Sequence, residues 1–457
     1  MDFAELSFPD APSIKVVPPG PKSREYLDFQ WSQEGGAVSY SRGLPMALRR
    51  GRGATVEDVD GNVYIDFFGG AAVMNVGHSH PEVVAAAAAQ LKDLTHALDI
   101  PTPVRKALVE KLMMVLPADL NRVFFGGPTG SDAVESAVKL AKYNSGRIPL
   151  IAMEGGYHGM SSGALALTSA LDFKQDFLPL IPEVHFVPYA YCYRCAFGRE
   201  PHTCSLECAR YLEHVLEDSH SGVGKPAAVI LEAIQGEGGS VVPPEKYLPE
   251  VRRICRRHEV LLILDEIQAG FCRTGKMFSF EHTGAVPDIM TMSKALGGIG
   301  LPISGVAYGE ALDTWPPGKH IGTFRGNAVA YAAGAAALDV MVRDHLAGHA
   351  AELGEEMLAW LNDATEKSRC VGEVRGKGLM LGVELVKDQE SKEPAPDLAK
   401  AVRTECHRRG LLVEIGGRFD TVVRFLPPLV LTRDLAQKGV AIFADALQAA
   451  ETTSLNT

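Results

Sequence analysis

The sequence predicts an α/β protein built on one large, mainly parallel β-sheet, and three observations support this fold class. First, seven short apolar runs lie between residues 123 and 308, with patterns typical of helices between most of them. Second, two of these runs end in a carboxylate, at the end of a strand where open α/β sheets bind ligands. Third, the chain has 457 residues, of which 46% are hydrophobic, which is enough for two domains. The apolar runs are 123–125, 150–153, 185–187, 227–231, 260–264, 289–292 and 303–308.

Composition and charge exclude several classes of function. A net charge of −11 argues against nucleic acid or an anionic membrane as the main partner. No apolar run reaches transmembrane length, and the acidic start Met-Asp-Phe-Ala-Glu-Leu lacks the basic and apolar regions of a signal peptide. We therefore expect a cytoplasmic protein that binds neither nucleic acid nor a membrane.

The two ends of the chain carry weaker signals. Residues 1–43 contain Pro18-Pro-Gly-Pro21 and predict a loosely structured arm, of a kind that often packs on a neighbouring subunit. Residues 55–66 alternate around Asp60-Gly-Asn62 and predict a β-hairpin. Residues 376–384 predict an antiparallel strand.

A strand, a Gly-rich turn and an amphipathic helix are predicted over residues 123–142. Small residues in the turn let backbone N–H groups approach a phosphate, and the helix N-terminus adds its positive dipole. We assign Gly130 and Ser131 as the phosphate cradle. A unit of this type also binds nucleotides, so the motif alone indicates only an anion.

Lys294 lies between the apolar run 289–292 and a Gly-rich stretch that ends at Gly300. The amine is therefore expected where a strand ends. Burial and nearby charge lower the pKa of an amine, and only a neutral amine attacks an aldehyde, so a lysine in such a place is a candidate covalent catalyst. A surface lysine after an edge strand is the alternative.

Asp265 follows five apolar residues that predict a buried parallel strand. A carboxylate at this end of a strand needs a cation. With pyridoxal phosphate as the ligand, Asp265 pairs with the protonated ring nitrogen and keeps the ring an electron sink. The alternatives are a carboxylate that caps the next helix or one that binds a metal.

Four of the eight cysteines, at positions 192, 195, 204 and 208, have the spacing Cys-x2-Cys-x8-Cys-x3-Cys. Such spacing in an intracellular protein can bind structural zinc through thiolates. The alternative is four reduced thiols on a surface excursion. Stable disulfides are not expected without a secretory signal.

Two motifs together resemble one enzyme family. Leu264-Asp-Glu-Ile-Gln-Ala-Gly-Phe-Cys-Arg-Thr-Gly275, followed about thirty residues later by Ser293-Lys-Ala-Leu-Gly-Gly298, is similar to the class III aminotransferases, the ω-aminotransferase group of pyridoxal-phosphate enzymes. The resemblance runs from about Leu44 to the C-terminal region. It implies a fold-type-I enzyme with a large domain around a mainly parallel seven-stranded sheet, and a smaller α+β domain from both chain ends. The implied boundaries are 1–85 for the arm and part of the small domain, 86–338 for the large domain and 339–457 for the rest of the small domain.

The resemblance also assigns roles to individual residues. It implies that Lys294 holds the cofactor covalently and moves a proton between substrate and cofactor, while Asp265 stabilises the carbanion. Thr323 matches a position whose hydroxyl reaches the cofactor phosphate of the neighbouring subunit, which implies a homodimer with shared active sites. Tyr157 matches the aromatic residue that stacks on the cofactor ring, with a buried core tyrosine as the alternative. The other implied cofactor contacts are Gly130 and Ser131 at the phosphate, Gln268 at the ring hydroxyl, and Glu232 at the end of a strand near the cofactor.

Glu237 and Arg424 are the implied substrate contacts. In the family a glutamate at the position of Glu237 pairs with an arginine from the smaller domain, and Arg424 occupies that position. When Glu237 neutralises Arg424, the pocket accepts an uncharged or cationic side chain; when Glu237 swings aside, the guanidinium binds a carboxylate. A permanent salt bridge is the alternative. Met160 is a departure, because several dicarboxylate-using relatives have an arginine there.

The implied reaction transfers an amino group from an amine donor to a 2-oxo acid. Residues 20–24, 39–45, 159–168 and 312–318 most resemble 2,4-diaminobutyrate:2-oxoglutarate aminotransferases, which makes L-2,4-diaminobutyrate the expected donor and glutamate and an aldehyde the products. One alternative is another ω-amine donor, such as 4-aminobutyrate, ornithine or a biosynthetic aldehyde–amine pair. Another is a racemase or epimerase that reprotonates the α-carbon with the same lysine. A non-catalytic pyridoxal-phosphate protein is disfavoured by the presence of Lys294, Asp265, Tyr157 and the phosphate turn together.

Overall fold

The computed structural model of the protein describes residues 2–454, and the chain divides into two compact units. The central unit runs from Glu82 to Ala347, and the predicted large domain, 86–338, lies within it. The terminal unit combines the residues up to Pro81 with those from Gly348 onward. None of the helices in the described residues has the length and apolar character needed to cross a membrane.

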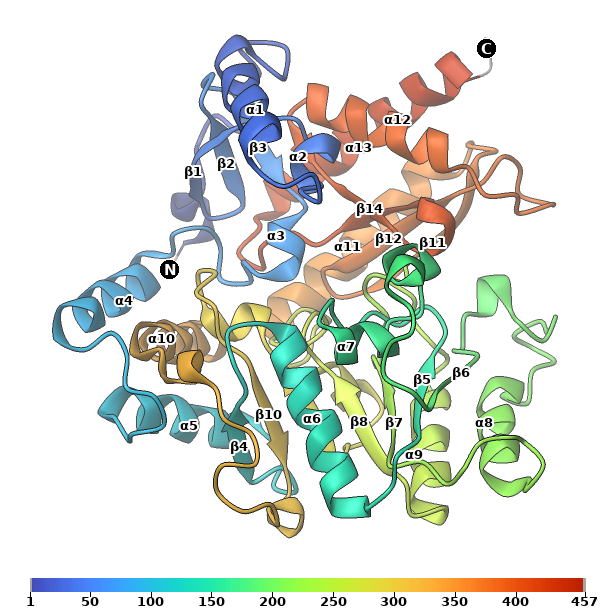
Figure 1. Ribbon diagram of the computed structural model, residues 1–457. Helices are drawn as coiled ribbons and strands as arrows, with labels where there is room; N and C mark the ends of the chain where they lie inside the picture. The colour runs from blue at the N-terminus through green and yellow to red at the C-terminus, as the bar shows by residue number, and fades with distance from the viewer. Residues whose placement is uncertain (1, 455–457) are drawn as a thin grey trace. The chain divides into compact units, whose positions relative to one another are not determined.

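A seven-stranded sheet forms the core of the central unit and confirms the predicted strands (Figure 1). Its strand order is β4, β10, β9, β8, β7, β5, β6. The strands from β9 to β6 pair in parallel, whereas β10 is antiparallel to both of its neighbours, β9 and β4. The strands are β4 (Arg122–Phe125), β5 (Leu150–Met153), β6 (Val184–Val187), β7 (Ala228–Leu231), β8 (Leu261–Asp265), β9 (Ile289–Met292) and β10 (Gly305–Tyr308).

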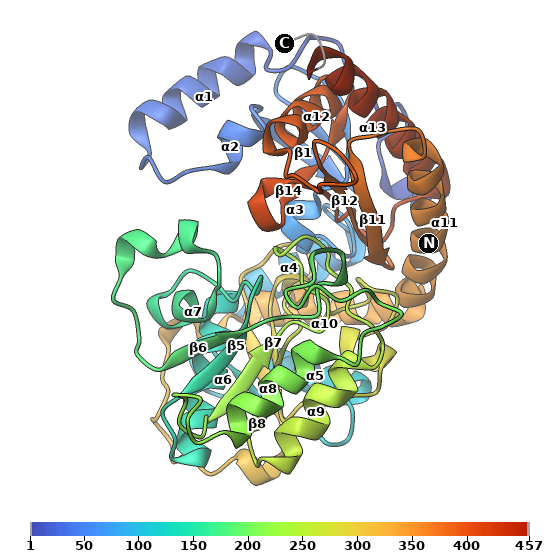
Figure 2. The ribbon, with the colours of Figure 1, turned by 90° about the vertical axis from the view of Figure 1, so that its right-hand side faces the viewer.

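Helices on both faces explain why these strands are continuous apolar runs. Every residue of β5, β7, β9 and β10 is buried, as expected for strands covered on both sides. The predicted helix after β4 is α6 (Gly130–Ser145), whose apolar side packs on the middle strands. Figure 2 shows α8 (Glu207–Glu217) and α9 (Tyr247–Arg257) on the opposite face. The other helices of this unit are α4 (Pro81–Asp93), α5 (Pro103–Val115), α7 (Ser162–Leu167) and α10 (Ala328–Arg343).

The terminal unit contains two four-stranded sheets, ordered β1-β2-β3-β13 and β11-β12-β15-β14. The predicted hairpin is confirmed, because β2 and β3 pair antiparallel across a turn in which Gly61 has a φ of +86°. The strands are β1 (Leu48–Arg52), β2 (Thr55–Asp58), β3 (Val63–Asp66), β11 (Val371–Lys377), β12 (Met380–Leu385), β13 (Leu411–Leu412), β14 (Glu414–Gly416) and β15 (Val422–Phe425). The helices are α1 (Pro21–Gln33), α2 (Tyr40–Gly43), α3 (Gly69–Ala72), α11 (Leu346–Thr365), α12 (Pro396–Arg408) and α13 (Arg433–Ser454).

Of two predictions for the chain ends, one is wrong and the other is confirmed with different bounds. The arm expected to be loosely structured contains the 13-residue helix α1. Pro21 suits its first position, and the Asp60 carboxylate accepts the backbone N–H groups of Lys22 and Ser23 at 2.9 and 2.8 Å. The antiparallel strand expected over 376–384 is confirmed as β12, but it begins only at Met380, because Gly378 has a φ of +56° and turns the chain between β11 and β12.

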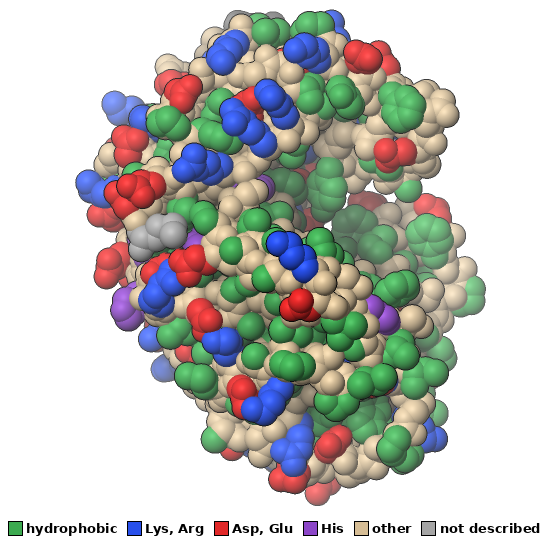
Figure 3. Space-filling model, turned by 90° about the vertical axis from the view of Figure 1, so that its left-hand side faces the viewer, with side chains coloured by type: hydrophobic (Ala, Val, Ile, Leu, Met, Phe, Trp, Pro, Cys, Tyr) green, Lys and Arg blue, Asp and Glu red, His purple; other side chains and the backbone are tan. Residues whose placement is uncertain are grey.

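On the face drawn in Figure 3, acidic and basic side chains are interspersed and hydrophobic side chains are exposed among them.

Candidate active site

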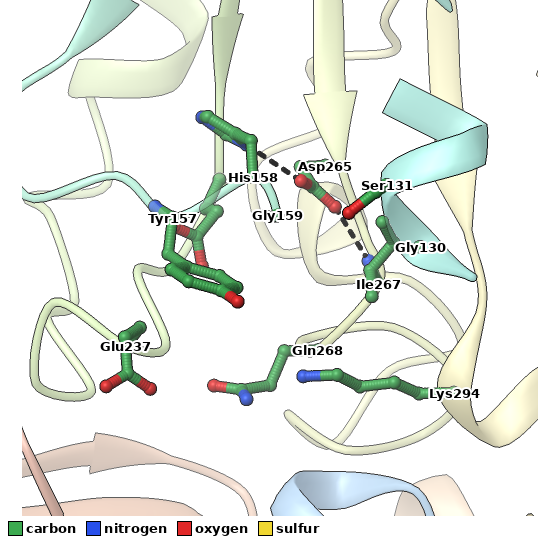
Figure 4. A pocket seen from close by; sticks show the side chains of 11 residues that line it. Gly130, Ser131, Tyr157, His158, Gly159, Glu237, Asp265, Ile267, Gln268 and Lys294 are labelled. Atoms are coloured by element: carbon green, nitrogen blue, oxygen red, sulfur yellow. Dashed lines mark hydrogen bonds and ion pairs between the residues drawn. The ribbon is translucent and has the colours of Figure 1, made fainter. Parts of the chain in front are cut away.

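A cavity of about 180 Å³ lies in the central unit, where the predicted site residues come together (Figure 4). All the predicted site residues except Thr323 and Arg424 line it. The lining residues are Gly130, Ser131, Tyr157, His158, Gly159, Glu232, Glu237, Asp265, Ile267, Gln268 and Lys294.

Lys294 begins the 3₁₀-helix Lys294–Gly297, directly after Ser293 and the end of β9. Its φ of +47° lies in the left-handed region, which costs a non-glycine residue about 1–3 kcal/mol. Figure 4 shows its side chain extended into the cavity toward Gln268. The strand end therefore presents an amine to the cavity, as predicted, at the cost of local backbone strain.

Asp265 ends β8, and its carboxylate is 4% exposed. Its Oδ2 atom lies 2.8 Å from Nδ1 of His158, and Oδ1 accepts hydrogen bonds from Oγ1 of Thr291 at 2.9 Å and from the backbone N of Ile267 at 3.1 Å. The bond from Ile267 stabilises the turn after β8, much as a capping carboxylate would. The Asp265 carboxylate nevertheless lines the cavity. These contacts hold the carboxylate in one orientation at the cavity wall, where it can pair with a cation.

His158 is the site residue that the sequence analysis missed. Its side chain is fully buried beside Asp265, and Nδ1 faces the carboxylate. The bond fixes the orientation of Asp265. Its position next to Tyr157 in the sequence was the only available signal.

The phosphate cradle forms at the N-terminus of α6. Ser131 Oγ accepts the backbone N–H of Met160 at 3.1 Å, which joins the helix start to the loop after β5. A Cβ atom at Gly159, whose φ is +122°, would lie 2.1 Å from that Oγ, so only glycine permits this approach. The N-terminus of a 16-residue helix favours an anion, which agrees with the predicted role of Gly130 and Ser131.

Tyr157 forms part of the cavity wall. Its ring is only partly buried and meets the ring of Phe173 edge-on, with 5.7 Å between centroids. The structure therefore does not place it as a fully buried core tyrosine. A ring held in this way offers a planar ligand an aromatic surface.

Two carboxylates complete the lining. Glu232 follows β7, and burial raises the pKa of its carboxyl to about 7, while nearby His158 acts in the opposite direction. Glu237 lies in the Gly-rich loop beyond and is partly buried. Arg424 is 2% exposed and lies on β15 of the terminal unit.

Thr323 does not line the cavity of its own chain. It begins the 3₁₀-helix Thr323–Gly326, beside a separate surface hollow. Met160 is 47% exposed and lines another hollow. The hollow at Thr323 is lined by Leu98, Asp99, Ile100, Ile321, Gly322, Thr323 and Arg325.

The four cysteines do not form a preassembled thiolate site within residues 2–454. Three or more possible metal ligands gather within 4.8 Å only at Glu213, Glu217 and His258. The two glutamates there already pair with Arg257. Among the cysteines, Sγ of Cys204 donates to Glu207 at 3.2 Å, and burial raises the pKa of Cys208 to about 12. None of the four takes part in a disulfide.

The cavity combines four chemical features: an anion cradle, an aromatic wall, a buried carboxylate and an amine. This set fits pyridoxal phosphate, which has a phosphate, a planar ring, a protonated ring nitrogen and an aldehyde. The clash that a Cβ at Gly159 would cause shows that the cradle is shaped for close backbone approach.

Comparisons with known proteins agree with this chemistry. The family model of the class-III aminotransferases matches residues 37–447. A diaminobutyrate–2-oxoglutarate aminotransferase of Haemophilus influenzae is 44% identical, over 93% of this chain and 95% of its own, and further relatives have the same description. An alanine/serine racemase of Pyrococcus horikoshii is 34% identical, over 97% of this chain and 94% of its own. A solved amine transaminase from an uncultivated Pseudomonas species, in its PLP-bound form, has a TM-score of 0.83 and 32% identity, over 92% of this chain and 97% of its own.

Proposed function

We propose a specific reaction for this chain, which belongs to the class-III aminotransferase family. The enzyme transfers the terminal amino group of a diamino acid, L-2,4-diaminobutyrate, to 2-oxoglutarate and produces glutamate and an aldehyde. The observation that carries the reaction type is one cavity that holds the amine of Lys294 and the buried carboxylate of Asp265. The relatives described as diaminobutyrate–2-oxoglutarate aminotransferases, 36–44% identical, support the choice of donor and acceptor.

The cofactor of the family is pyridoxal phosphate. When bound, it supplies an aldehyde that links covalently to amines and a ring that withdraws electrons from the carbon next to the amine. We assign Lys294 to the aldehyde, Asp265 to the ring nitrogen and Tyr157 to the ring face. Gly130 and Ser131 hold the phosphate, and Gln268 donates to the ring hydroxyl.

The chain's own groups then perform the proton transfers. Lys294 Nζ takes a proton from the carbon that carries the donor amine and returns it on the cofactor side, because it is the amine that extends into the cavity. Asp265 is held in place by His158 and Thr291, and in our proposal it stabilises positive charge on the group it faces.

Glu237 supports the preference for a cationic donor. Its carboxylate lines the cavity, and by neutralising Arg424 it removes a positive charge that would repel the ammonium group of a diamino acid. In our proposal it pairs with Arg424 while the donor is bound. It releases Arg424 when 2-oxoglutarate enters, and the guanidinium then binds the distal carboxylate in a bidentate pair.

A panel of amines tests the proposed donor. We expect 2,4-diaminobutyrate to bleach the visible band of the lysine-bound cofactor, and 2-oxoglutarate to restore it with one glutamate per site. 4-Aminobutyrate, ornithine, lysine and isoleucine are expected to bleach it at least about tenfold more slowly, because each lacks or displaces one charged group of the donor, and a hydrogen bond to a charged group is worth about 1.5–3 kcal/mol. Bleaching only by one of the other amines contradicts the donor and leaves the reaction type intact.

Racemisation is a second candidate, favoured by the alanine/serine racemase that matches this chain over 97% of its length. A racemase needs the same lysine but no amino-group acceptor. Loss of optical rotation from an amino acid in the absence of 2-oxoglutarate, with no glutamate formed, supports this candidate.

The predicted cytoplasmic location stays a prediction from the sequence.

We infer a homodimer in which Thr323 completes the phosphate site of the partner. Several large apolar side chains around Thr323 are exposed, among them Ile100 at 65%, Ile321 at 75% and Phe324 at 70%. An exposed apolar cluster of this kind marks an interaction surface. The Asp99 carboxylate binds the guanidinium of Arg325 and so holds the turn that carries Thr323.

Replacement of Ile321 with glutamate is expected to dissociate the dimer and to weaken cofactor binding by about tenfold or more, because it buries a charge at the interface. Light scattering should show a fall to the 49.1 kDa monomer. Met114, 83% exposed on α5, provides the control, since Met114→Glu changes a surface site away from Thr323. A wild-type monomer, or a dimer in Ile321→Glu, contradicts the interface.

A further inference from the structure

Glu232 uses both of its carboxylate oxygens within the protein. Oε1 accepts the backbone N–H of Tyr157 at 3.1 Å, and Oε2 accepts the backbone N–H of Gly236 at 2.8 Å. These donors belong to two different loops: the Tyr157 loop (residues 154–161) and the Glu237 loop (residues 235–241). We propose that Glu232 is a positioning residue that fixes the two loops relative to each other and to β7, rather than a cofactor ligand.

We call this connection of the two loops to β7 through Glu232 the Glu232 joint. The two loops also contact each other directly: Gln235 Nε2 donates to the carbonyl of Glu154 at 2.9 Å, and Gly238 packs so closely that a Cβ would lie 2.6 Å from the carbonyl of Gly155. Glu232, in contrast, directly follows a fully buried strand and is 5% exposed. It ties both loops to the rigid sheet.

The joint couples two functions that the proposed mechanism assigns to separate residues. Tyr157 holds the cofactor ring, and Glu237 selects the donor. If the bond to either loop is lost, both side chains shift, because the loops contact each other. The expected effect on donor binding rests on the proposed function, because that function gives Glu237 its role. The expected effect on cofactor binding acts through Tyr157 and does not depend on the donor.

Burial gives the joint a pH dependence. The groups that face Glu232 are His158 on the Tyr157 loop, Asp265 on β8 and Tyr189 after β6. Burial raises the pKa of Glu232 to about 7. Above this pH both oxygens accept N–H groups, whereas below it one oxygen carries a proton that opposes its N–H partner. The ties are therefore complete at high pH and weaken as the pH falls through 7.

The matched pair Glu232→Gln and Glu266→Gln tests the proposal. Glu266 is also fully buried with a pKa raised to about 7, and it accepts the backbone N–H groups of Ser279 and Phe280 at 2.9 and 3.0 Å, but it does not line the cavity. Glu232→Gln is expected to raise the dissociation constant of pyridoxal phosphate from the apoenzyme, and the KM of the donor, each about tenfold. Glu266→Gln should lower Tm by about as much as Glu232→Gln does. It should leave the cofactor dissociation constant and the KM of the donor unchanged.

The pH series provides an independent readout. In the wild type, the cofactor dissociation constant should rise from pH 8 to pH 6 more steeply than in Glu232→Gln, and as steeply as in Glu266→Gln. Glu232→Asp, which keeps the charge but shortens the reach, is a second variant should Glu232→Gln fold poorly, and it should also weaken cofactor binding. The cofactor titration uses no donor, so its result does not depend on the donor's identity. Tm loss without a change in cofactor binding or its pH dependence overturns the proposal.

Discussion

Replacement of Lys294 with alanine is expected to lower kcat for amino transfer by about 10⁴-fold, the upper range of a proton-transfer contribution. The variant loses both the amine that binds the cofactor covalently and the group that moves the proton. Its visible spectrum should lack the band of lysine-bound cofactor. The measurement is glutamate formation from the donor and 2-oxoglutarate, with the spectrum recorded on the same sample.

Chemical rescue separates catalysis from misfolding in this variant. Added methylamine should restore part of the rate, because a free amine can act as the missing base. Lys142→Ala provides the control, since Lys142 lies on α6 but does not line the cavity. More than about 1% of wild-type activity in Lys294→Ala contradicts the assignment of Lys294 as the base.

Asp265→Asn should lower kcat by about 10²–10³-fold, the usual cost of removing one electrostatic stabiliser from a buried site. The amide keeps the shape of the carboxylate and can still bind His158, but it no longer carries the charge that holds a protonated ring nitrogen. We expect the KM of the donor to change little, since Asp265 lies beneath the reacting atoms in our assignment. Stopped-flow rates of the donor half-reaction measure the effect directly.

Asp288→Asn is the matched control for Asp265. Asp288 is bound by Arg252 at 2.6 and 2.8 Å and by the backbone N–H of Leu262 at 2.7 Å, and it does not line the cavity. Its loss should lower Tm and leave kcat unchanged. A fall of less than about fivefold in kcat for Asp265→Asn, or an equal fall in both variants, argues against a special electrostatic role.

The sheet could be predicted because its inner strands are buried on both faces and therefore appear as unbroken apolar runs. The run 289–292 coincides with β9 (Ile289–Met292), and the run 303–308 contains β10 (Gly305–Tyr308). Helix α1 could not be predicted in this way, because only Ser23 and Leu27 are buried along it. Its start is fixed by Asp60, a residue distant in the sequence.

The site residues that carry a sequence motif were found, and those defined by contacts were not. Lys294 and Asp265 follow apolar runs, so the sequence indicates their place at the ends of strands. His158 acts through a 2.8 Å contact with a residue 107 positions away, which no local pattern encodes. Likewise, the sequence placed Glu232 near the cofactor, but only the structure shows that both oxygens accept backbone N–H groups.

The fate of one nitrogen atom tests the proposed reaction most directly. L-2,4-diaminobutyrate labelled with nitrogen-15 at its terminal amine is incubated with the enzyme and 2-oxoglutarate, and glutamate is analysed by mass spectrometry. The proposed function predicts that every glutamate formed carries the label and that the donor becomes the aldehyde. Unlabelled glutamate, which shows transfer of the α-amine, or inversion of the donor without glutamate, contradicts it.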